Sequence, residues 1–189
     1  EIYQCDWSSD VCSSDLVGGN GVSASVGLEE EWDGNLPGTN YIPNVTAKVG
    51  IEQGWGGVTL FAAYDDDDDQ AGRDDEFALK AIATFKATEQ LTLEAMAIYN
   101  SGPSFYSNGY DWSVAGWAKF QVNDKLAIGA GGQYLSDLHG TSLDDWNIGA
   151  VVDYKIVENF DAKLAVNYDD GDSYTDGQFS GFLRFTRSF

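Results

Sequence analysis

The sequence feature that most limits the folds open to this chain is an alternation of apolar and polar residues, repeated from residue 18 to the C-terminus. In the last such segment the apolar face consists of Phe179, Gly181, Leu183, Phe185 and Phe189. Because successive side chains of a β-strand point to opposite faces, each segment fits a strand with one apolar and one polar face. The repetition predicts an all-β, antiparallel fold of about ten strands. The predicted strands are residues 22–28, 45–51, 58–64, 77–85, 91–99, 112–120, 126–134, 146–156, 160–168 and 178–189.

The connections between these segments alternate in length. A soluble sandwich has no reason to gather every long loop at one end, whereas barrels of the bacterial outer membrane have short periplasmic turns and long outer loops. The pattern therefore predicts an antiparallel transmembrane β-barrel that crosses the outer membrane many times. The short connections are residues 53–57, 88–90, 123–125 and 157–159, and the long ones are residues 33–44, 65–75, 100–110, 136–143 and 169–177.

Two series of aromatic residues stand at the ends of the apolar faces. Four tyrosines precede long loops at intervals of about 35 residues, and three phenylalanines close the opposite ends. Because tyrosine and tryptophan favour the interface between membrane and water, the two series predict aromatic girdles on either side of a bilayer. Aromatic packing across the strands of a soluble sheet is the alternative. The predicted girdle residues are Tyr64, Tyr99, Tyr134 and Tyr168 at one end and Phe85, Phe120 and Phe189 at the other.

The charges are distributed unevenly between the two faces. The 189 residues include 10 Lys and Arg against 31 Asp and Glu, a formal net charge of −21, which argues against nucleic acid as a partner because phosphate binding needs a basic surface. Seven of the ten basic residues nevertheless fall on the polar face of a predicted strand. A Lys or Arg on the lipid face costs about 2–4 kcal/mol at mid-bilayer, so a water-filled lumen accounts for this placement. The predicted pore-lining basic wall is Lys48, Lys80, Lys86, Lys119, Lys155, Lys163 and Arg184.

Nothing in the sequence indicates an enzyme, a cofactor or a metal site. His139 is the single histidine, no Ser or Cys stands in a nucleophile motif, and no His and Cys have metal-ligand spacing. The acidic run Asp65–Asp69 resembles a calcium loop in spacing, but Gln70 replaces the necessary glycine and strands flank the run, which favours a solvated outer loop. Weak cation binding by this run is the alternative. Gly129–Gly132 lie inside a predicted strand, where glycine favours bending or close packing.

The first sixteen residues differ in character from the rest. Residues 6–16, D-W-S-S-D-V-C-S-S-D-L, resemble the in-frame translation of a common sequencing adapter, and Cys5 and Cys12 lie beside and within them. A disulfide between these cysteines is the alternative interpretation. We set residues 1–16 aside as non-native and treat residues 17–189 as one domain, in which no run of about 18 apolar residues predicts a transmembrane helix. Since an exported chain needs a signal peptide, we expect this domain to be a truncated piece.

Three stretches carry a resemblance to a known family. They are E-F-A-L-K-A-I-A-T-F-K-A at residues 76–87, W-A-K-F-Q-V-N-D-K-L at residues 117–126 and the ending F-L-R-F-T-R-S-F. They resemble the alphaproteobacterial general porins of the Rhizobium–Brucella type, over nearly everything from Gly18 to Phe189. The terminal Phe189 also resembles the assembly signal of outer-membrane barrels, with Arg187 where that signal has an apolar residue.

The resemblance implies a sixteen-stranded, trimeric barrel, of which this chain would supply about the ten C-terminal strands as an open or incompletely closed sheet. It implies a porin, which allows passive diffusion of small hydrophilic solutes and ions through a water-filled channel without a cofactor. The family's acidic constriction loop would precede this chain and face the basic wall. The implied partners are outer-membrane lipid and lipopolysaccharide, the other subunits of a homotrimer, and the barrel assembly machinery. A non-conducting outer-membrane barrel that serves adhesion or anchoring is the alternative.

Overall fold

The computed structural model describes the chain apart from residues 1–10, 18–19, 30–42, 66–74, 105 and 189, and describes only the backbone of Val11–Val17. Eleven strands form one antiparallel sheet, in which each strand pairs with its neighbours in the sequence. Within this part of the chain, no helix has the length and apolar character needed to cross a membrane. The strands are β1 (Val11–Val17), β2 (Val22–Glu29), β3 (Asn44–Gln53), β4 (Gly56–Asp65), β5 (Glu76–Lys86), β6 (Leu91–Asn100), β7 (Tyr110–Asn123), β8 (Leu126–Leu138), β9 (Asp145–Val157), β10 (Phe160–Gly171) and β11 (Gln178–Arg187).

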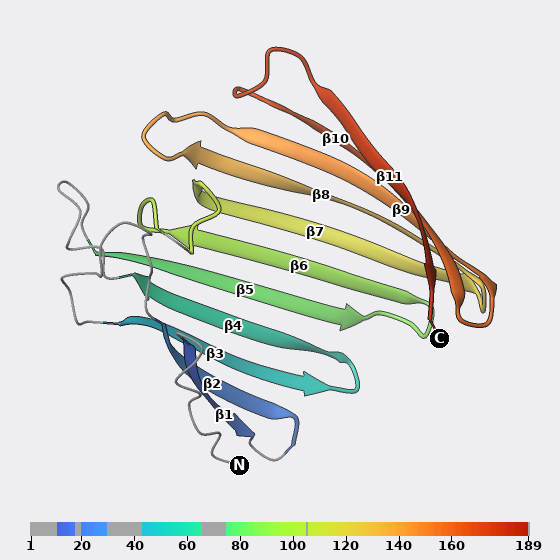
Figure 1. Ribbon diagram of the computed structural model, residues 1–189, viewed down its shortest axis with the longest axis horizontal. Helices are drawn as coiled ribbons and strands as arrows, with labels where there is room; N and C mark the ends of the chain where they lie inside the picture. The colour runs from blue at the N-terminus through green and yellow to red at the C-terminus, as the bar shows by residue number, and fades with distance from the viewer. Residues whose placement is uncertain (1–10, 18–19, 30–42, 66–74, 105, 189) are drawn as a thin grey trace.

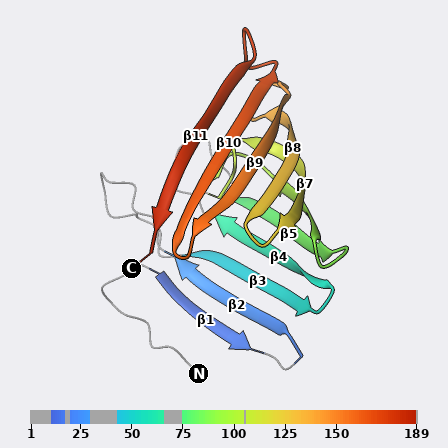
Figure 2. The same cartoon turned by 90° about the vertical axis from the view of Figure 1, so that its right-hand side faces the viewer.

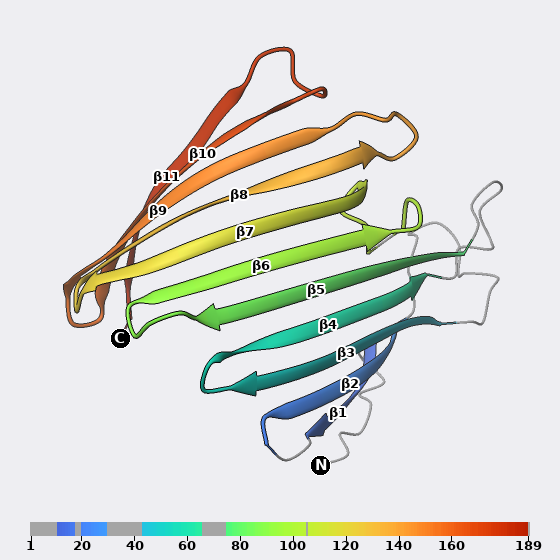
Figure 3. The ribbon, with the colours of Figure 1, turned by 180° about the vertical axis from the view of Figure 1, so that it is seen from behind.

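The sheet is a single curled layer. Its two faces are seen in Figure 1 and, from behind, in Figure 3. Figure 2 shows the curl from the side, with β1 and β11 as the two edges of the sheet. The predicted all-β, antiparallel, incompletely closed barrel sheet is therefore confirmed.

The two faces of this layer have opposite character, as the alternation predicts. Leu79 of β5 pairs with Tyr99 of β6 on one face, while the next residue, Lys80, pairs with Ile98 on the other. Hollows in the sheet are lined by residues of the polar face, such as Asn147, so the polar face is the concave one. The apolar residues of the alternating pattern consequently cover the convex face.

The layer has almost no apolar interior. Among the described residues, Ala78 and Ala127 are the only buried apolar side chains, and many large apolar side chains are between 37% and 78% exposed. Soluble monomers rarely expose continuous apolar surface on this scale. In the hydrocarbon core of a membrane, the same apolar side chains contact apolar lipid chains, and hydrogen bonds between neighbouring strands pair the backbone N–H and C=O groups. The convex face is thus built to lie against lipid.

Connections of different length lie at opposite ends of the strands (Figure 1). Short turns of two to four residues join β3 to β4, β5 to β6, β7 to β8 and β9 to β10. At the other end, the connections that the structure describes are residues 101–109 (except residue 105), 139–144 and 172–177. The connections after β2 and β4 lie mostly outside the described residues. The predicted alternation of short and long connections is confirmed for the described part of the chain.

β8 shows the largest extension of a strand beyond its predicted C-terminal limit. β8 continues past Tyr134 to Leu138, which pairs with Tyr110 of β7. Asp137 adopts a positive φ of 57°, and its N–H donates to Asp144 Oδ1 at 2.9 Å. Sequence periodicity misses this extension because Ser136 and Asp137 are residue types that favour turns. The acceptor for the Asp137 N–H is the side chain of Asp144, which lies beyond the following loop.

The eleventh strand comes from the segment that the sequence analysis set aside. Val11–Val17 forms β1, an edge strand that pairs with β2 from Val11 opposite Glu29 to Val17 opposite Ser23. An open sheet edge presents unpaired N–H and C=O groups to any extended segment. Pairing through the backbone requires no particular side chains, so β1 is compatible with either origin of residues 1–16.

Candidate functional site

All seven residues of the predicted basic wall lie on the concave face. Their cross-strand partners are other residues of the polar face; Lys163, for example, pairs with both Asp153 and Arg184. Four of the seven form two groups whose surroundings differ. The seven residues are Lys48 on β3, Lys80 and Lys86 on β5, Lys119 on β7, Lys155 on β9, Lys163 on β10 and Arg184 on β11.

The first group, which we call the paired-lysine site, consists of Lys48, Phe61 and Lys80. Phe61 on β4 pairs with Lys48 of β3 and with Lys80 of β5. The Nζ atoms of Lys48 and Lys80 lie 5.9 Å and 5.8 Å from the centre of the Phe61 ring, within cation–π range. In the described part of the chain, neither lysine forms an ion pair with a carboxylate. Two positive charges therefore face the concave side without a contacting negative charge.

The connection between β6 and β7 reaches across the concave side toward β2. Tyr106 donates a hydrogen bond from Oη to Glu29 Oε2 at 2.8 Å, and Glu29 Oε1 accepts another from Thr46 Oγ1 at 3.2 Å. Burial, together with the hydrogen bond and negative charge of Glu29, raises the pKa of Tyr106 above its ordinary value of 10.0. The phenol thus stays protonated and acts as a hydrogen-bond donor.

The second group, which we call the salt-bridged site, consists of Lys119, Asp153 and Lys163. Asp153 Oδ1 lies 3.2 Å from Lys163 Nζ, and Asp153 Oδ2 lies 3.7 Å from Lys119 Nζ. Lys163 is directly opposite Asp153 in the sheet. Lys119 reaches Asp153 across β8, where Gly129 and Ala127 occupy the intervening positions. One carboxylate therefore offsets part of the charge of two cations.

Aromatic side chains on the concave face were not anticipated from the sequence. Trp117 lies against Gly129, where an added Cβ would stand 2.6 Å from Trp117 Cζ2, so the predicted close packing at this glycine is confirmed. The guanidinium carbon of Arg184 lies 5.8 Å from the centre of the Phe182 ring. A signal was present, since Phe61, Trp117 and Phe182 break the polar parity of their strands, but only the fold shows which cation or glycine each one meets.

The predicted girdle tyrosines lie near the long-loop end, and three of them donate hydrogen bonds to aspartates at that end. Tyr64 donates from Oη to Asp75 at 2.6 Å, Tyr134 to Asp144 at 2.5 Å and Tyr168 to Asp170 at 3.0 Å. Aromatic pairs run along the same end: the ring centres of Phe77 and Tyr99, Trp112 and Tyr134, Trp146 and Tyr168, and Tyr168 and Phe179 are 4.7–5.8 Å apart. Phe85 and Phe120 lie exposed at the turn end, and Phe189 is outside the described residues.

Asp144 has the largest set of hydrogen-bond partners described for these three aspartates. Its carboxylate accepts hydrogen bonds from Tyr134 Oη at 2.5 Å, from Ser136 Oγ at 2.9 Å and from Asp137 N–H at 2.9 Å. The hydrogen bond from Tyr134, followed by the other two, lowers the pKa of Asp144 below its ordinary value of 3.8. A negative charge is thereby fixed beside Tyr134, an arrangement that strand periodicity does not reveal.

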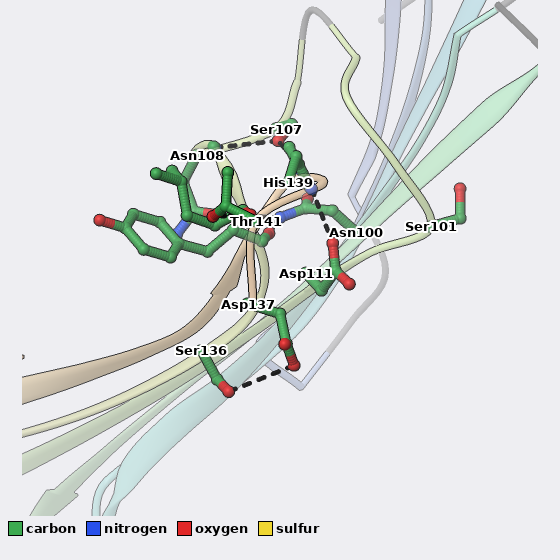
Figure 4. Close-up of polar contacts among 12 residues, drawn as sticks. Asn100, Ser101, Ser107, Asn108, Asp111, Ser136, Asp137, His139 and Thr141 are labelled. Atoms are coloured by element: carbon green, nitrogen blue, oxygen red, sulfur yellow. Dashed lines mark hydrogen bonds and ion pairs between the residues drawn. The ribbon is translucent and has the colours of Figure 1, made fainter. Parts of the chain in front are cut away.

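The connections 101–109 and 139–144 are joined through His139 (Figure 4). His139 Nδ1 lies 2.6 Å from Asp111 Oδ1, and His139 Nε2 lies 2.5 Å from Ser107 Oγ. This order of Ser, His and Asp matches that of hydrolase triads, but the Gly109 N–H donates to Ser107 Oγ at 2.9 Å, which makes Ser107 part of a tight turn. The arrangement therefore fastens one loop to the next.

Two alternatives from the sequence analysis, cation binding by the acidic run and a disulfide between the two cysteines, fall mostly on residues that the structure does not describe. Among the described residues, no group of three or more His, Cys, Asp or Glu side chains is placed to hold a metal ion. Of the acidic run, Asp65 is described and almost fully buried, and residues 66–69 lie outside the described residues. Cys5 and the side chain of Cys12 also lie outside them.

Comparison with known sequences places these observations in context. The chain matches the Porin subfamily over residues 7–184. It is 32% identical to outer membrane protein IIIA of Rhizobium leguminosarum bv. viciae, over 85% of this chain and 48% of that protein. It is 30% identical to porin Omp2b of Brucella canis, over 92% of this chain and 50% of that protein. The chain thus spans about half the length of the curated relatives that it matches.

A solved structure shares the fold. The outer membrane channel DcaP of Acinetobacter baumannii superposes with a TM-score of 0.75 at 14% sequence identity, covering 95% of this chain and 62% of that one. At this identity the likeness concerns the fold alone. The curled antiparallel sheet of this chain is therefore a fold that an outer-membrane channel also contains.

Proposed function

The chain belongs to the porin subfamily of bacterial outer-membrane proteins, and from this premise we propose that the whole protein forms a water-filled channel for passive diffusion of small hydrophilic solutes and ions. The observation that carries the proposal is the contrast between the two faces of one curled layer. The convex face exposes large apolar side chains, and the concave face carries the seven basic residues. A sheet of this kind separates lipid from water.

The proposed mechanism is physical rather than chemical. A water-filled passage sets a size limit, and charged groups along its wall orient water and bias the choice of ions. The basic wall supplies positive charge, and Asp153 supplies negative charge within ion-pair distance of two lysines. Diffusion of this type requires no cofactor, and we propose that the protein is not an enzyme.

The whole protein, in this proposal, completes the barrel with strands that this chain does not include. Each edge of the described sheet, β1 and β11, pairs on one side only, and an open edge cannot stand in hydrocarbon. We propose a sixteen-stranded barrel that assembles as a homotrimer in contact with lipid and lipopolysaccharide. Phe189 is the proposed signal for the assembly machinery, and the girdle residues are proposed to hold the barrel at the two interfaces.

Residues 1–16 are proposed to be foreign to the protein. The proposal rests on the resemblance of residues 6–16 to the in-frame translation of a sequencing adapter. Reading the source DNA upstream across the Leu16–Val17 junction tests it. Further alternating strands directly joined to Val17 would support the proposal, whereas the same sixteen residues in the genome would refute it.

Ion selectivity of the whole protein in a planar bilayer tests the proposed function. Replacing Lys80, Lys119 and Arg184 together by glutamine removes positive charge from the wall, so the reversal potential in a KCl gradient should move toward cation selectivity. The same three-residue change leaves the convex face and the sheet register untouched. An unchanged reversal potential would refute the role of the wall, and a complete lack of single-channel conductance would favour the non-conducting adhesion or anchoring barrel.

A further inference from the structure

A hollow in the concave face lies beside the paired-lysine site. Its volume is about 430 Å³, and its lining includes Lys48, Phe61, Lys80, Ile98, Tyr106 and Asn108. Sites for small molecules typically measure about 300–1,000 Å³ and combine apolar walls with a few placed polar groups. This hollow meets both conditions, since a phenyl ring and an aliphatic side chain stand next to two ammonium groups.

The floor of the hollow carries two positively charged side chains that no carboxylate of the described residues offsets. Lys48 and Lys80 stand on the two strands that flank Phe61 and, among the described residues, form no ion pair with a carboxylate. Elsewhere on the wall, Asp153 partly neutralises Lys119 and Lys163. A negatively charged group entering the hollow therefore gains two cation contacts without first displacing an internal partner.

The opposite side of the hollow is formed by the connection between β6 and β7, which is fastened at two places. On one side, Tyr106 Oη donates to Glu29 Oε2 at 2.8 Å on β2. On the other, Ser107 is joined through His139 to Asp111 (Figure 4). A segment fixed by partners on both sides loses little freedom when a solute binds, so less of the binding free energy is lost to ordering.

We propose that this hollow is a binding subsite for small organic anions that carry one carboxylate on a flat apolar body, an inference that rests on the proposed channel function. The carboxylate is placed at the ammonium groups of Lys48 and Lys80, and the body packs against Phe61 and Ile98. Tyr106 supplies a phenol at the opposite side. Glu29, which accepts hydrogen bonds from the lining residues Tyr106 and Thr46, adds a negative charge that disfavours ions with several negative charges.

The subsite gives the channel a preference that its width alone does not supply. A strongly hydrated inorganic anion gains only the charge of the two lysines, whereas an aromatic carboxylate also removes apolar surface from water, at about 25 cal/mol per Å². Binding of aromatic carboxylates at this subsite raises their local concentration in the channel. The preferred solutes are thus anionic and partly apolar.

Benzoate block of KCl current through single channels of the whole protein tests the proposal. Benzoate should interrupt the current in a concentration-dependent manner, and uncharged benzyl alcohol should not. In the Lys48→Gln, Lys80→Gln double variant, the benzoate concentration for half-maximal block should rise by about tenfold or more, as expected for the loss of charge-assisted contacts. Lys125→Gln serves as the matched charge control, because Lys125 lies in the turn between β7 and β8, and it should keep the wild-type value.

A second variant separates the apolar part of the site from its charge. Phe61→Leu keeps both lysines but removes the ring, so block by benzoate should weaken while block by acetate stays as it is. Calorimetric titration of the detergent-solubilised proteins with benzoate compares the affinities of the wild type and the variant without a current measurement. Melting curves first establish that each variant is folded.

The outcomes distinguish this inference from the channel function. A channel that conducts KCl but is blocked equally by benzoate in the wild type and in the double variant overturns the subsite and leaves the channel function intact. Equal weakening of acetate and benzoate block in Phe61→Leu overturns the apolar part of the site. A folded protein without conductance overturns the channel function and this inference with it.

Discussion

The paired-lysine site and the salt-bridged site contain the same type of residue on the same face, yet they differ in available charge. Lys48 and Lys80 face an aromatic ring, while Lys119 and Lys163 share one carboxylate, that of Asp153. Knowing that a lysine lies on the polar face of a strand is therefore not enough to know how much of its charge is available. The side chains on nearby strands decide whether the charge of such a lysine remains available in the proposed channel or is partly offset by a carboxylate on the same face.

Small residues make the second site possible. Lys119 and Asp153 stand on strands that are not adjacent, and Gly129 and Ala127 of β8 lie between them. Trp117 packs against the same strand at Gly129. No equivalent gap exists in the first site, where Phe61 stands on the middle strand between Lys48 and Lys80.

The largest expected effect breaks the packing beneath the salt-bridged site. In Gly129→Val, the new side chain collides with Trp117, whose Cζ2 would lie 2.6 Å from the Cβ, and overpacking typically costs about 1–3 kcal/mol. We expect a lower melting temperature and a lower yield of folded protein. Gly116→Val is the matched control, because a Cβ at Gly116 meets nothing within 4 Å. Equal losses in both variants would contradict the packing role of Gly129.

The next effect converts the salt-bridged site into a second free cation site. Asp153→Asn removes the carboxylate from Lys119 and Lys163, so the reversal potential in a KCl gradient should move toward anion selectivity. Glu94→Gln is the control, because Glu94 lies on the same face and forms no ion pair with a basic residue among the described residues. The shifts for Asp153→Asn and Glu94→Gln should differ in size, and equal shifts would mean that only total charge matters.

A smaller effect compares single lysines from the two sites. Lys80→Gln removes an uncompensated charge, whereas Lys119→Gln removes one that Asp153 already offsets. Because partly exposed ion pairs are weak, the offset is incomplete, and the shift toward cations for Lys119→Gln should be about half that for Lys80→Gln or less. Reversal potentials measured at low and high salt check this, since screening should shrink both shifts. A larger shift for Lys119→Gln would reverse the comparison.

The smallest effect concerns Tyr106 at the edge of the paired-lysine site. Because its pKa in the folded protein is raised, its contribution to loop stability is fully present below pH 10 and is lost as pH rises through the folded value. Tyr106→Phe, which lacks the hydrogen bond to Glu29, should weaken benzoate block by an amount equivalent to about 0.5–1.5 kcal/mol and leave the melting temperature unchanged. Only the part of the pH dependence that disappears in Tyr106→Phe belongs to the tyrosine.

Local patterns in the sequence determined much of this fold. Alternation fixed the strands and their faces, because side-chain direction in a strand has a period of two residues. Lys80 could be placed on the polar face and Leu79 on the apolar face from their neighbours alone. Turn residues and connection lengths likewise separated the two ends of the barrel sheet, since each short turn is a local structure.

The candidate site depended on information that is not local. Parity places Lys119 and Asp153 on one face, but their contact depends on the register of two strand pairs and on the small residues of β8. The contact from Tyr106 to Glu29 joins residues 77 positions apart in the sequence, and the link from Ser107 to His139 joins two separate loops. Strand periodicity has no means of encoding such pairs, because they follow from how the sheet curls and which way a loop folds. The sequence by itself thus determined which residues face water, and the tertiary structure decided which of them meet.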